Sequence, residues 1–250
     1  TGEVLFHRNT RQIRLTHFGQ QLWQHGQQQL AQLEQLLSPR QASTELAGLV
    51  RLAAPAAYRP VLTPLLLEFA RLYPQIQLDI RLSDQHSDVV DEQIDLGIRA
   101  GLLRDQSFVA VPVSKVALWL VASPAYLAST KAPTSLAELA EHPQTSVLDG
   151  STGRAWSWFF ANGDTYTPRH VRFLVNDTAE EIAALVAGLG IGQVADFLAK
   201  PWIASGELVR LLPELEPEPW PVSLYRPQRG PVPVRIRLLF DYLREHLPKS

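Results

Sequence analysis

The pattern of apolar and polar positions separates an N-terminal arm from a longer region of alternating elements. Residues 3–8 and 11–15 read as two short extended segments joined by a polar corner. Thr16 is a suitable N-cap for the Pro-free segment from His17 to Leu37, in which apolar residues recur at helical spacing. We therefore predict a small hairpin, one long helix, and then a linker at residues 38–43.

The long helix carries a narrow apolar stripe with a glutamine-rich back. The stripe consists of Leu22, Leu30, Leu33 and Leu37, with Trp23 and Leu36 beside it. It is explained either by packing on its own domain or by pairing with a second helix. A helix of this length spans about 30 Å, and a linker isolates it from the next domain, so we favour dimerisation.

Beyond Gly48, strand-like and helix-like segments alternate. The predicted strands are 49–54, 76–82, 95–99, 116–122, 145–148, 170–175, 191–194 and 222–225, and the predicted helices are 60–73, 87–93, 135–141, 179–187 and 234–247. This order predicts an α/β fold with a mostly parallel sheet covered by helices. Two similar blocks of roughly 80 to 100 residues fit two small lobes better than one barrel.

Composition and charge narrow the class of protein. No apolar run approaches the roughly 18 residues of a membrane span, and no export signal is visible, so we expect no membrane association. The absence of cysteine rules out disulfides and thiolate metal sites and is consistent with a cytoplasmic protein. The net charge of −2 argues against a surface that binds nucleic acid throughout, although Arg8, Arg11 and Arg14 form a local basic patch.

Motifs of enzymes are not found. The glycines of 188–192 follow a predicted helix and enter a strand, which is the reverse of the dinucleotide fingerprint. Residues 149–153 do not form the nucleophile elbow G-x-S-x-G, and the histidines include no H-E-x-x-H pair. We therefore expect no catalytic residues, no metal and no cofactor, and interpret the protein as a non-enzyme.

The segment Leu5 to Leu22 reads L-F-x-R-x-x-R-x-x-x-L-T-x-x-G-x-x-L and resembles the signature of LysR-type transcriptional regulators. Further segments resemble landmarks of that family in the same order, namely G-L-V-R-L from Gly48, F-A-R-L-Y-P from Phe69, D-L-G-I-R from Asp95, V-A-S-P-A-Y-L from Val121 and A-G-L-G-I from Ala187. The ordered set covers essentially all 250 residues.

The resemblance implies a two-lobed, periplasmic-binding-protein-like effector domain preceded by a wing remnant and a long dimerisation helix. The implied boundaries are 1–16 for the wing, 17–38 for the dimerisation helix, 39–47 for a linker and 48–250 for the effector domain, with lobe I at about 48–121 and 226–250 and lobe II at about 122–225. The helix-turn-helix that precedes the wing in the family is missing from this sequence, which also begins Thr1-Gly2-Glu3 and contains no Met, so we expect a longer protein.

The implied function is transcription regulation. The full-length protein would bind promoter DNA, sense an unknown small-molecule effector between the lobes, and form a homodimer or homotetramer. The alternative is a solute-binding receptor of a transporter, which would share the two-lobed fold. A basic hairpin and a long helix over residues 5–37 are not expected in such a receptor.

Candidate DNA contacts are Arg8, Arg11 and Thr16 in the wing. Arginines there can neutralise phosphates, which positions a protein on DNA without reading its sequence. The alternative is that these arginines are solvated hairpin charges.

Candidate effector contacts in lobe I are Pro55, Ala56 and Ala57, at the carboxyl end of a strand, where open α/β sheets bind ligands. The family often has Ser or Thr here, so the alanines favour an apolar pocket or backbone contacts over a carboxylate site. Arg99 and Ala100 end another strand. Arg99 pairs either with an anionic effector or, structurally, with Asp95 or Glu92.

Lobe II contributes the candidates Asp149, Asn176 and Gln193 at the ends of its strands. Asn176, together with Asp177, is also explained as a cap for the following helix. The hinge is predicted at the two crossings near 122–123 and 225–226.

Overall fold

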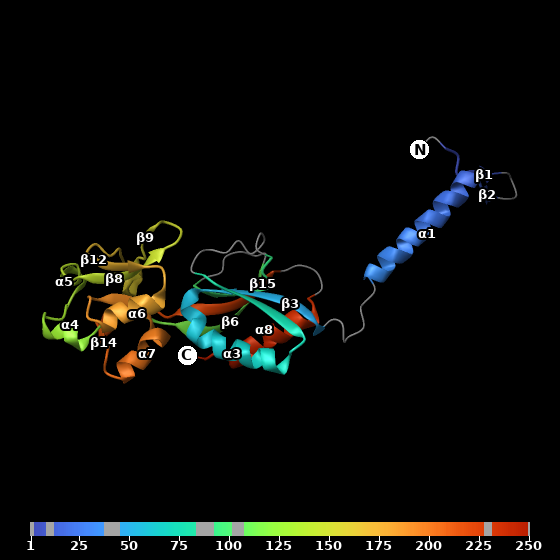
Figure 1. Cartoon of the computed structure of the whole chain (residues 1–250). Helices are drawn as coiled ribbons and strands as arrows, with labels where there is room; N and C mark the ends of the chain where they lie inside the picture. Colours follow the sequence, from blue (N-terminus) through green and yellow to red (C-terminus); the bar gives the residue numbers. More distant parts are fainter. Residues whose placement is uncertain are drawn as a thin grey trace. The chain divides into compact units, whose positions relative to one another are not determined.

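The computed structural model of the chain describes residues 3–8, 13–37, 46–83, 93–101, 108–227 and 232–249. It divides into two compact units, Thr1–Glu45 and Leu46–Ser250 (Figure 1). The predicted linker at 38–43 lies outside the described residues, as does the predicted short helix at 87–93 except for its last residue.

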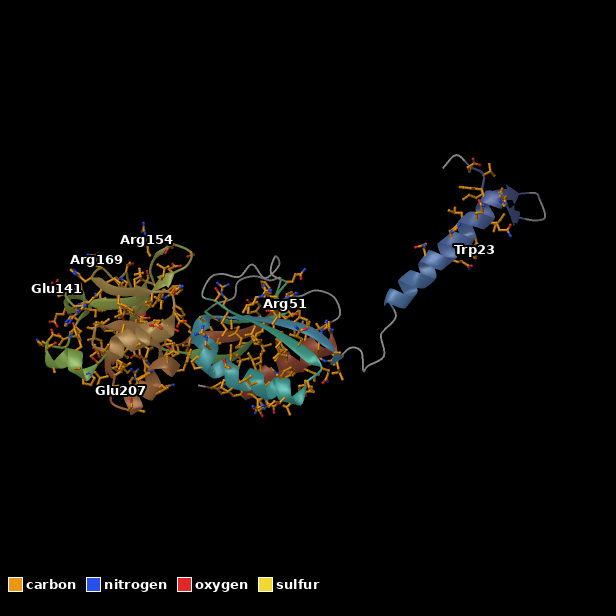
Figure 2. All side chains as sticks on the ribbon, in the orientation of Figure 1. Trp23, Arg51, Glu141, Arg154, Arg169 and Glu207 are labelled. Carbon is orange, nitrogen blue, oxygen red and sulfur yellow. The ribbon has the colours of Figure 1, made fainter. Side chains whose placement is uncertain are left out.

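The first unit is the predicted hairpin and helix. Strands β1 (Phe6–Arg8) and β2 (Ile13–Leu15) pair antiparallel, and α1 (His17–Leu37) comes next with the predicted bounds. Large apolar side chains of α1 are exposed within this unit, with Leu22 at 51%, Trp23 at 57% and Leu30 at 60%. Trp23 projects away from the helix (Figure 2). The side chains of Leu33, Leu36 and Leu37 are outside the described set.

Thr16 and Gly19, at the start of α1, contact the backbone of the residues that precede β1. The Thr16 hydroxyl donates to the Val4 carbonyl over 2.8 Å and accepts from the Gly19 N–H over 2.9 Å. A Cβ on Gly19 would lie only 2.2 Å from the Leu5 carbonyl oxygen. The L-T-x-x-G spacing therefore combines an N-cap with a close backbone approach that only glycine permits.

Lobe I of the second unit is built on a five-stranded sheet with the order β4-β3-β5-β15-β6. The strands are β3 (Gly48–Ala54), β4 (Ile76–Leu82), β5 (Leu96–Ala100), β6 (Phe108–Val116) and β15 (Trp220–Pro227). β3 pairs parallel with β4 and β5, whereas β15 pairs antiparallel with β5 and β6. Four of the five strands therefore run in the same direction and β15 alone runs opposite to them, so the prediction of a mostly parallel sheet is confirmed.

Two long helices, α3 (Arg59–Leu72) and α8 (Val234–His246), pack on one face of this sheet (Figure 1). Side chains alternate between the faces of a strand, so Val50 and Leu52 of β3 join the core with Phe69 of α3 and Leu239 of α8, all four fully buried. The core forms because the apolar stripes of both helices meet the apolar side of the sheet.

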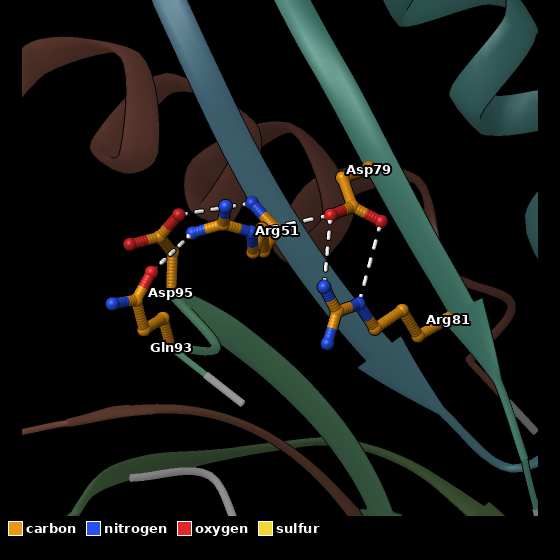
Figure 3. A network of polar contacts seen from close by, with 5 residues as sticks. All are labelled: Arg51, Asp79, Arg81, Gln93 and Asp95. Carbon is orange, nitrogen blue, oxygen red and sulfur yellow. Dashed lines mark hydrogen bonds and ion pairs between the residues drawn. The ribbon is translucent and has the colours of Figure 1, made fainter. Parts of the chain in front are cut away.

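A polar network occupies the other face of the sheet (Figure 3). The Arg51 guanidinium donates to Asp79 over 3.2 Å and to Gln93 over 3.0 Å, and Arg81 donates to the same Asp79. Asp95 accepts from the Arg51 backbone N–H over 2.9 Å. This network joins the β3–β4 pair to the residues that lead into β5.

Lobe II contains two three-stranded sheets, the two-stranded sheet β10-β11 and four α-helices. Its strands are β7 (Leu118–Ala122), β8 (Gln144–Asp149), β9 (Arg154–Ala155), β10 (Trp158–Phe159), β11 (Thr165–Tyr166), β12 (Val171–Val175), β13 (Gly192–Ala195) and β14 (Val209–Leu211). Its α-helices are α4 (Pro124–Ala128), α5 (Leu136–Leu139), α6 (Thr178–Val186) and α7 (Asp196–Ala204). In the three-stranded sheets the orders are β13-β7-β14 and β12-β8-β9, and a bridge between Gln144 and Ile191 connects these two sheets.

The hinge between the lobes lies at other residues than predicted, because two of the predicted strands belong to a different sheet than expected. The predicted strand 116–122 is the end of β6, in the lobe I sheet, followed after Ala117 by β7 of lobe II. The predicted strand 222–225 is the middle of β15, which lies in the lobe I sheet. The crossings therefore fall at Ala117 and at residues 216–219, before the predicted positions. An apolar run alone does not show which sheet a strand joins.

Candidate effector site at the lobe junction

Lobes I and II meet where the chain leaves the carboxyl end of β3. A short 3-10 turn, η1 (Ala56–Tyr58), leads into α3, and it lies next to α6 of lobe II. Pro55 provides the turn into η1, Ala56 is buried, and Ala57 is partly exposed. The predicted effector residues of lobe I thus lie on the side of β3 that adjoins lobe II.

The two residues after Ala57 contact lobe II directly. The Tyr58 ring packs against Phe197 of α7, with 5.0 Å between ring centroids. Arg59 Nη1 lies 3.2 Å from Asp177 Oδ2, which makes an ion pair between the start of α3 and the N-cap of α6. We call these four residues, Tyr58, Arg59, Asp177 and Phe197, the lobe junction.

Burial changes the chemistry of Tyr58. Its side chain is 7% exposed, and among the described residues its hydroxyl has no hydrogen-bond partner. Burial raises the pKa of this hydroxyl well above its usual range, and the nearby Asp196 carboxylate raises it further. Tyr58 therefore stays neutral and keeps a proton available to donate.

Asp196 anchors the first crossing. Its backbone N–H donates to the Ala117 carbonyl over 2.9 Å, and its Oδ1 accepts from the Ala117 N–H over 3.2 Å. Its other oxygen, Oδ2, accepts from Lys200 over 2.6 Å. The buried carboxylate thus fixes the single residue that separates β6 from β7.

The second crossing is bordered by aromatic rings. Trp220, the first residue of β15, pairs with Val116 of β6 and lies 4.8 Å from the Phe159 ring in an edge-on arrangement. Gln193 holds Phe159 in place, because its amide donates to the Phe159 carbonyl over 2.7 Å and accepts from the Phe159 N–H over 2.8 Å. Gln193, predicted as an effector contact, is therefore engaged with the backbone of β10.

The other candidates in lobe II lie at or just beyond the ends of strands. Asn176 is exposed and immediately precedes Asp177. Asp177 caps α6, as the alternative interpretation predicts, by accepting from the Ala179 N–H over 2.8 Å. Asp149 accepts from both the N–H and the hydroxyl of Ser151, and these hydrogen bonds lower the pKa of Asp149. Of these, Asn176 lies beside the junction.

Arg99 and Ala100 end β5 inside the lobe I sheet. Arg99 is exposed and pairs through its backbone with Ser223, while Ala100 pairs with Val222. Of the predicted partners of Arg99, Asp95 binds the Arg51 N–H, and Glu92 lies outside the described residues. Burial raises the pKa of Tyr225, and the positive charge of the nearby Arg99 partly opposes that rise.

Sequence reasoning missed the residues that make the contacts between lobes. Arg59 and Asp177 are 118 positions apart, so no local pattern relates them. Both stand at helix starts, and the sequence pattern indicated for Asp177 either a place at a strand end facing the cleft or a helix cap. The position of charged residues beside two helix N-termini was the available signal.

Lobe II also contains a buried carboxyl group. Glu181 of α6 is 2% exposed, and Thr145 donates a hydrogen bond to it over 3.3 Å. Burial raises the pKa of Glu181 to about 8, an effect that the Thr145 hydrogen bond partly opposes. Nothing in its sequence context, T-A-E-E, distinguishes it from the exposed Glu180.

The wing candidates lie in the first unit. Arg8 ends β1, but its side chain is not among those described, and Arg11 lies outside the described residues. Thr16 is placed by the hydrogen bonds of its hydroxyl with Val4 and Gly19, so its role in this unit is to cap α1.

Neither a membrane span nor a metal-binding cluster is found among the described residues. No helix in this part of the chain is long and apolar enough to cross a membrane. Within the same residues, no group of three or more His, Asp or Glu side chains is placed to hold a metal ion.

Comparisons with known proteins identify the family. The model of the LysR substrate binding domain matches residues 43–248. The probable HTH-type transcriptional regulator LtrA of Klebsiella pneumoniae is 31% identical over 99% of this chain and 82% of its own length, and the HTH-type transcriptional regulator PtxR of Pseudomonas aeruginosa is 31% identical over 100% and 80%.

A solved structure agrees with the sequence relatives. CrgA, a LysR-type transcriptional regulator from Neisseria meningitidis, matches with a TM-score of 0.72 and 27% identity over 99% of this chain and 85% of that one. These matches support the two-lobed fold and the regulator interpretation over the transporter receptor. The chain belongs to the LysR family of transcriptional regulators.

Proposed function

We propose that this regulator senses a small-molecule effector at the lobe junction and that a change in lobe angle transmits the signal to promoter binding. The observation that carries the proposal is that Tyr58 and Arg59, just beyond the end of β3, contact the starts of two lobe II helices. A ligand beside these residues touches both lobes. It shifts their arrangement if it binds one arrangement more tightly than the other.

The chemistry of the junction favours an effector with apolar surface. Pro55, Ala56 and Ala57 offer no side-chain hydrogen bonds, and the rings of Tyr58 and Phe197 lie close by. Asn176 directly precedes the junction residue Asp177 and is the polar candidate beside this set. We propose that the effector also reaches the strand-end residues Arg99, Ala100 and Asp149. Gln193 would contribute indirectly, by holding Phe159.

A thermal-shift screen of small organic acids and aromatic compounds tests the site. Compounds that bind the folded protein raise its melting temperature. We expect the same compounds to stabilise wild type and Ala204→Trp, a control at the exposed end of α7, but not Ala57→Trp, in which the indole occupies the junction. Equal stabilisation of Ala57→Trp would place the effector elsewhere.

We further propose that α1 mediates a homodimer or homotetramer, because Leu22, Trp23 and Leu30 expose apolar surface that a partner helix would cover. Size-exclusion chromatography with light scattering should show an oligomer for the wild type and a smaller species for the Leu22→Glu, Leu30→Glu double variant. Gln27→Glu on the same helix is the charge control. A monomeric wild type would contradict this role for α1.

We propose that Arg8 and Arg11 contact DNA phosphates in the full-length protein. We also propose that the regulator acts in the cytoplasm, where its promoter lies. Each phosphate contact contributes about one unit to the slope of log affinity against log salt. Replacing either arginine by alanine should reduce the slope by about one for specific and non-specific DNA alike. An unchanged slope would leave both arginines as solvated charges.

A further inference from the structure

The ion pair between Arg59 and Asp177 joins groups that are both accessible to water. The Arg59 side chain is 52% exposed and that of Asp177 is 32% exposed, with 3.2 Å between Nη1 and Oδ2. The ion pairs of Arg51 with Asp79 and of Lys200 with Asp196 each stay within one lobe. An exposed pair is weak enough to open and close readily.

Each partner is placed by its own helix start. Arg59 is the first residue of α3, directly after η1. Asp177 uses Oδ1 to cap α6, accepting from the Ala179 N–H over 2.8 Å, and Oδ2 to accept from Arg59. The cap holds the carboxylate in one orientation, so the ion pair reports the position of α3 relative to α6.

The neighbouring contact is apolar. Tyr58 packs on Phe197, and its buried hydroxyl makes no hydrogen bond to a described residue. Ring packing is less directional than a hydrogen bond, so this contact tolerates a small rotation of the lobes. The hydrogen bond within the ion pair beside it is lost once the distance between Nη1 and Oδ2 grows beyond hydrogen-bond range.

We propose that the Arg59–Asp177 ion pair is a latch that biases the two lobes toward the arrangement in this structure. The proposal rests on the proposed function in that lobe angle carries the signal, but it does not depend on the effector's identity. A ligand that favours another lobe angle must open the latch, and a ligand that favours this angle is assisted by it.

The test measures the distance between the lobes without any effector. The chain lacks cysteine, so Thr63→Cys on α3 and Ala204→Cys on α7, both exposed positions, give unique sites for spin labels. Double electron–electron resonance is recorded on labelled protein diluted with unlabelled protein, so that pairs within one chain dominate. The latch variants are Asp177→Asn, which keeps an N-cap residue, and Arg59→Gln.

The expected result is the same change in both variants. An exposed ion pair of ordinary strength shifts the ratio of lobe arrangements by roughly two- to fivefold, and the double variant should shift it no further. Asp241→Asn, which breaks the Arg244 pair within α8, is the matched control and should match the wild type. Unchanged distances in both single variants would overturn the latch, and so would a change in Asp177→Asn alone, since that points to the α6 cap.

The latch and the proposed effector site fail in different ways. If the distances do not respond but the thermal-shift hits depend on Ala57, the sensing site stands without the latch. If the distances respond and no hit depends on Ala57, the latch stands and the effector binds elsewhere.

Discussion

Replacement of Glu181 by glutamine should make the protein more stable at neutral and alkaline pH. The carboxyl is 2% exposed, and its pKa rises from 4.5 to about 8 because burial penalises the charged form. The folded state therefore holds this proton more tightly than the unfolded state does. Between pH 4.5 and 8 folding binds the proton, so this group's contribution to stability falls as pH rises and is fully lost above pH 8.

The magnitude is set by the two pKa values. A tenfold change in proton affinity corresponds to about 1.4 kcal/mol, so ionisation of Glu181 costs the folded state about 3 to 5 kcal/mol by pH 8. Glutamine has nearly the same shape and does not ionise, and it can still accept from Thr145. The free energies of unfolding of wild type and Glu181→Gln should be similar near pH 4.5 and diverge by that amount at pH 8.

Urea unfolding from about pH 4.5 to about pH 8.5 measures the difference directly. Glu180→Gln is the matched control, since Glu180 is the exposed neighbour in the same first turn of α6. Its difference from wild type should vary little with pH. The reasoning is refuted if the two variants give the same pH profile, because Glu181 would then be hydrated in the folded state.

Four further substitutions test other parts of the fold. Thr16→Ala removes the cap of α1 and should cost about 1 kcal/mol of helix stability, measured by circular dichroism; unchanged helicity and melting would remove the role given to this hydroxyl. Gly190→Ala places a Cβ 2.2 Å from the Pro143 carbonyl oxygen. It should destabilise lobe II by at least about 2 kcal/mol in urea unfolding. A Cβ at Gly26 has no neighbour within 4 Å, so Gly26→Ala should be neutral or stabilising by up to about 1 kcal/mol. Tyr58→Phe removes a buried hydroxyl without a described partner and should be neutral or stabilising by up to about 1 kcal/mol; a loss of about 2 kcal/mol would reveal a hydrogen bond there.

Elements with strong periodicity were predicted well from the sequence. The helix His17–Leu37 and the strand Ile76–Leu82 have the predicted bounds, because each carries an uninterrupted apolar pattern between clear end signals. Strand β6 was missed apart from its last residue. It contains Pro112 and lies at a sheet edge, where proline is tolerated but the local pattern does not look like a strand.

The candidate site was predicted only in outline. Pro55, Ala56 and Ala57 were placed correctly at the end of a strand, since the order of strands and helices determines where such ends lie. The contact of Arg59 with Asp177 and the burial of Glu181 depend on how separate segments pack. Periodicity within one segment carries no information on its partner in another.

The position of β15 in the middle of the lobe I sheet has a consequence for synthesis of the protein. All strands of lobe II lie between residues 118 and 211, whereas the lobe I sheet needs residues 220–227 between β5 and β6. On the ribosome, lobe II should therefore complete its sheets while β5 and β6 still await the strand that joins them. Chains released before residue 220 would expose unpaired edges of both strands and should aggregate even though lobe II is whole.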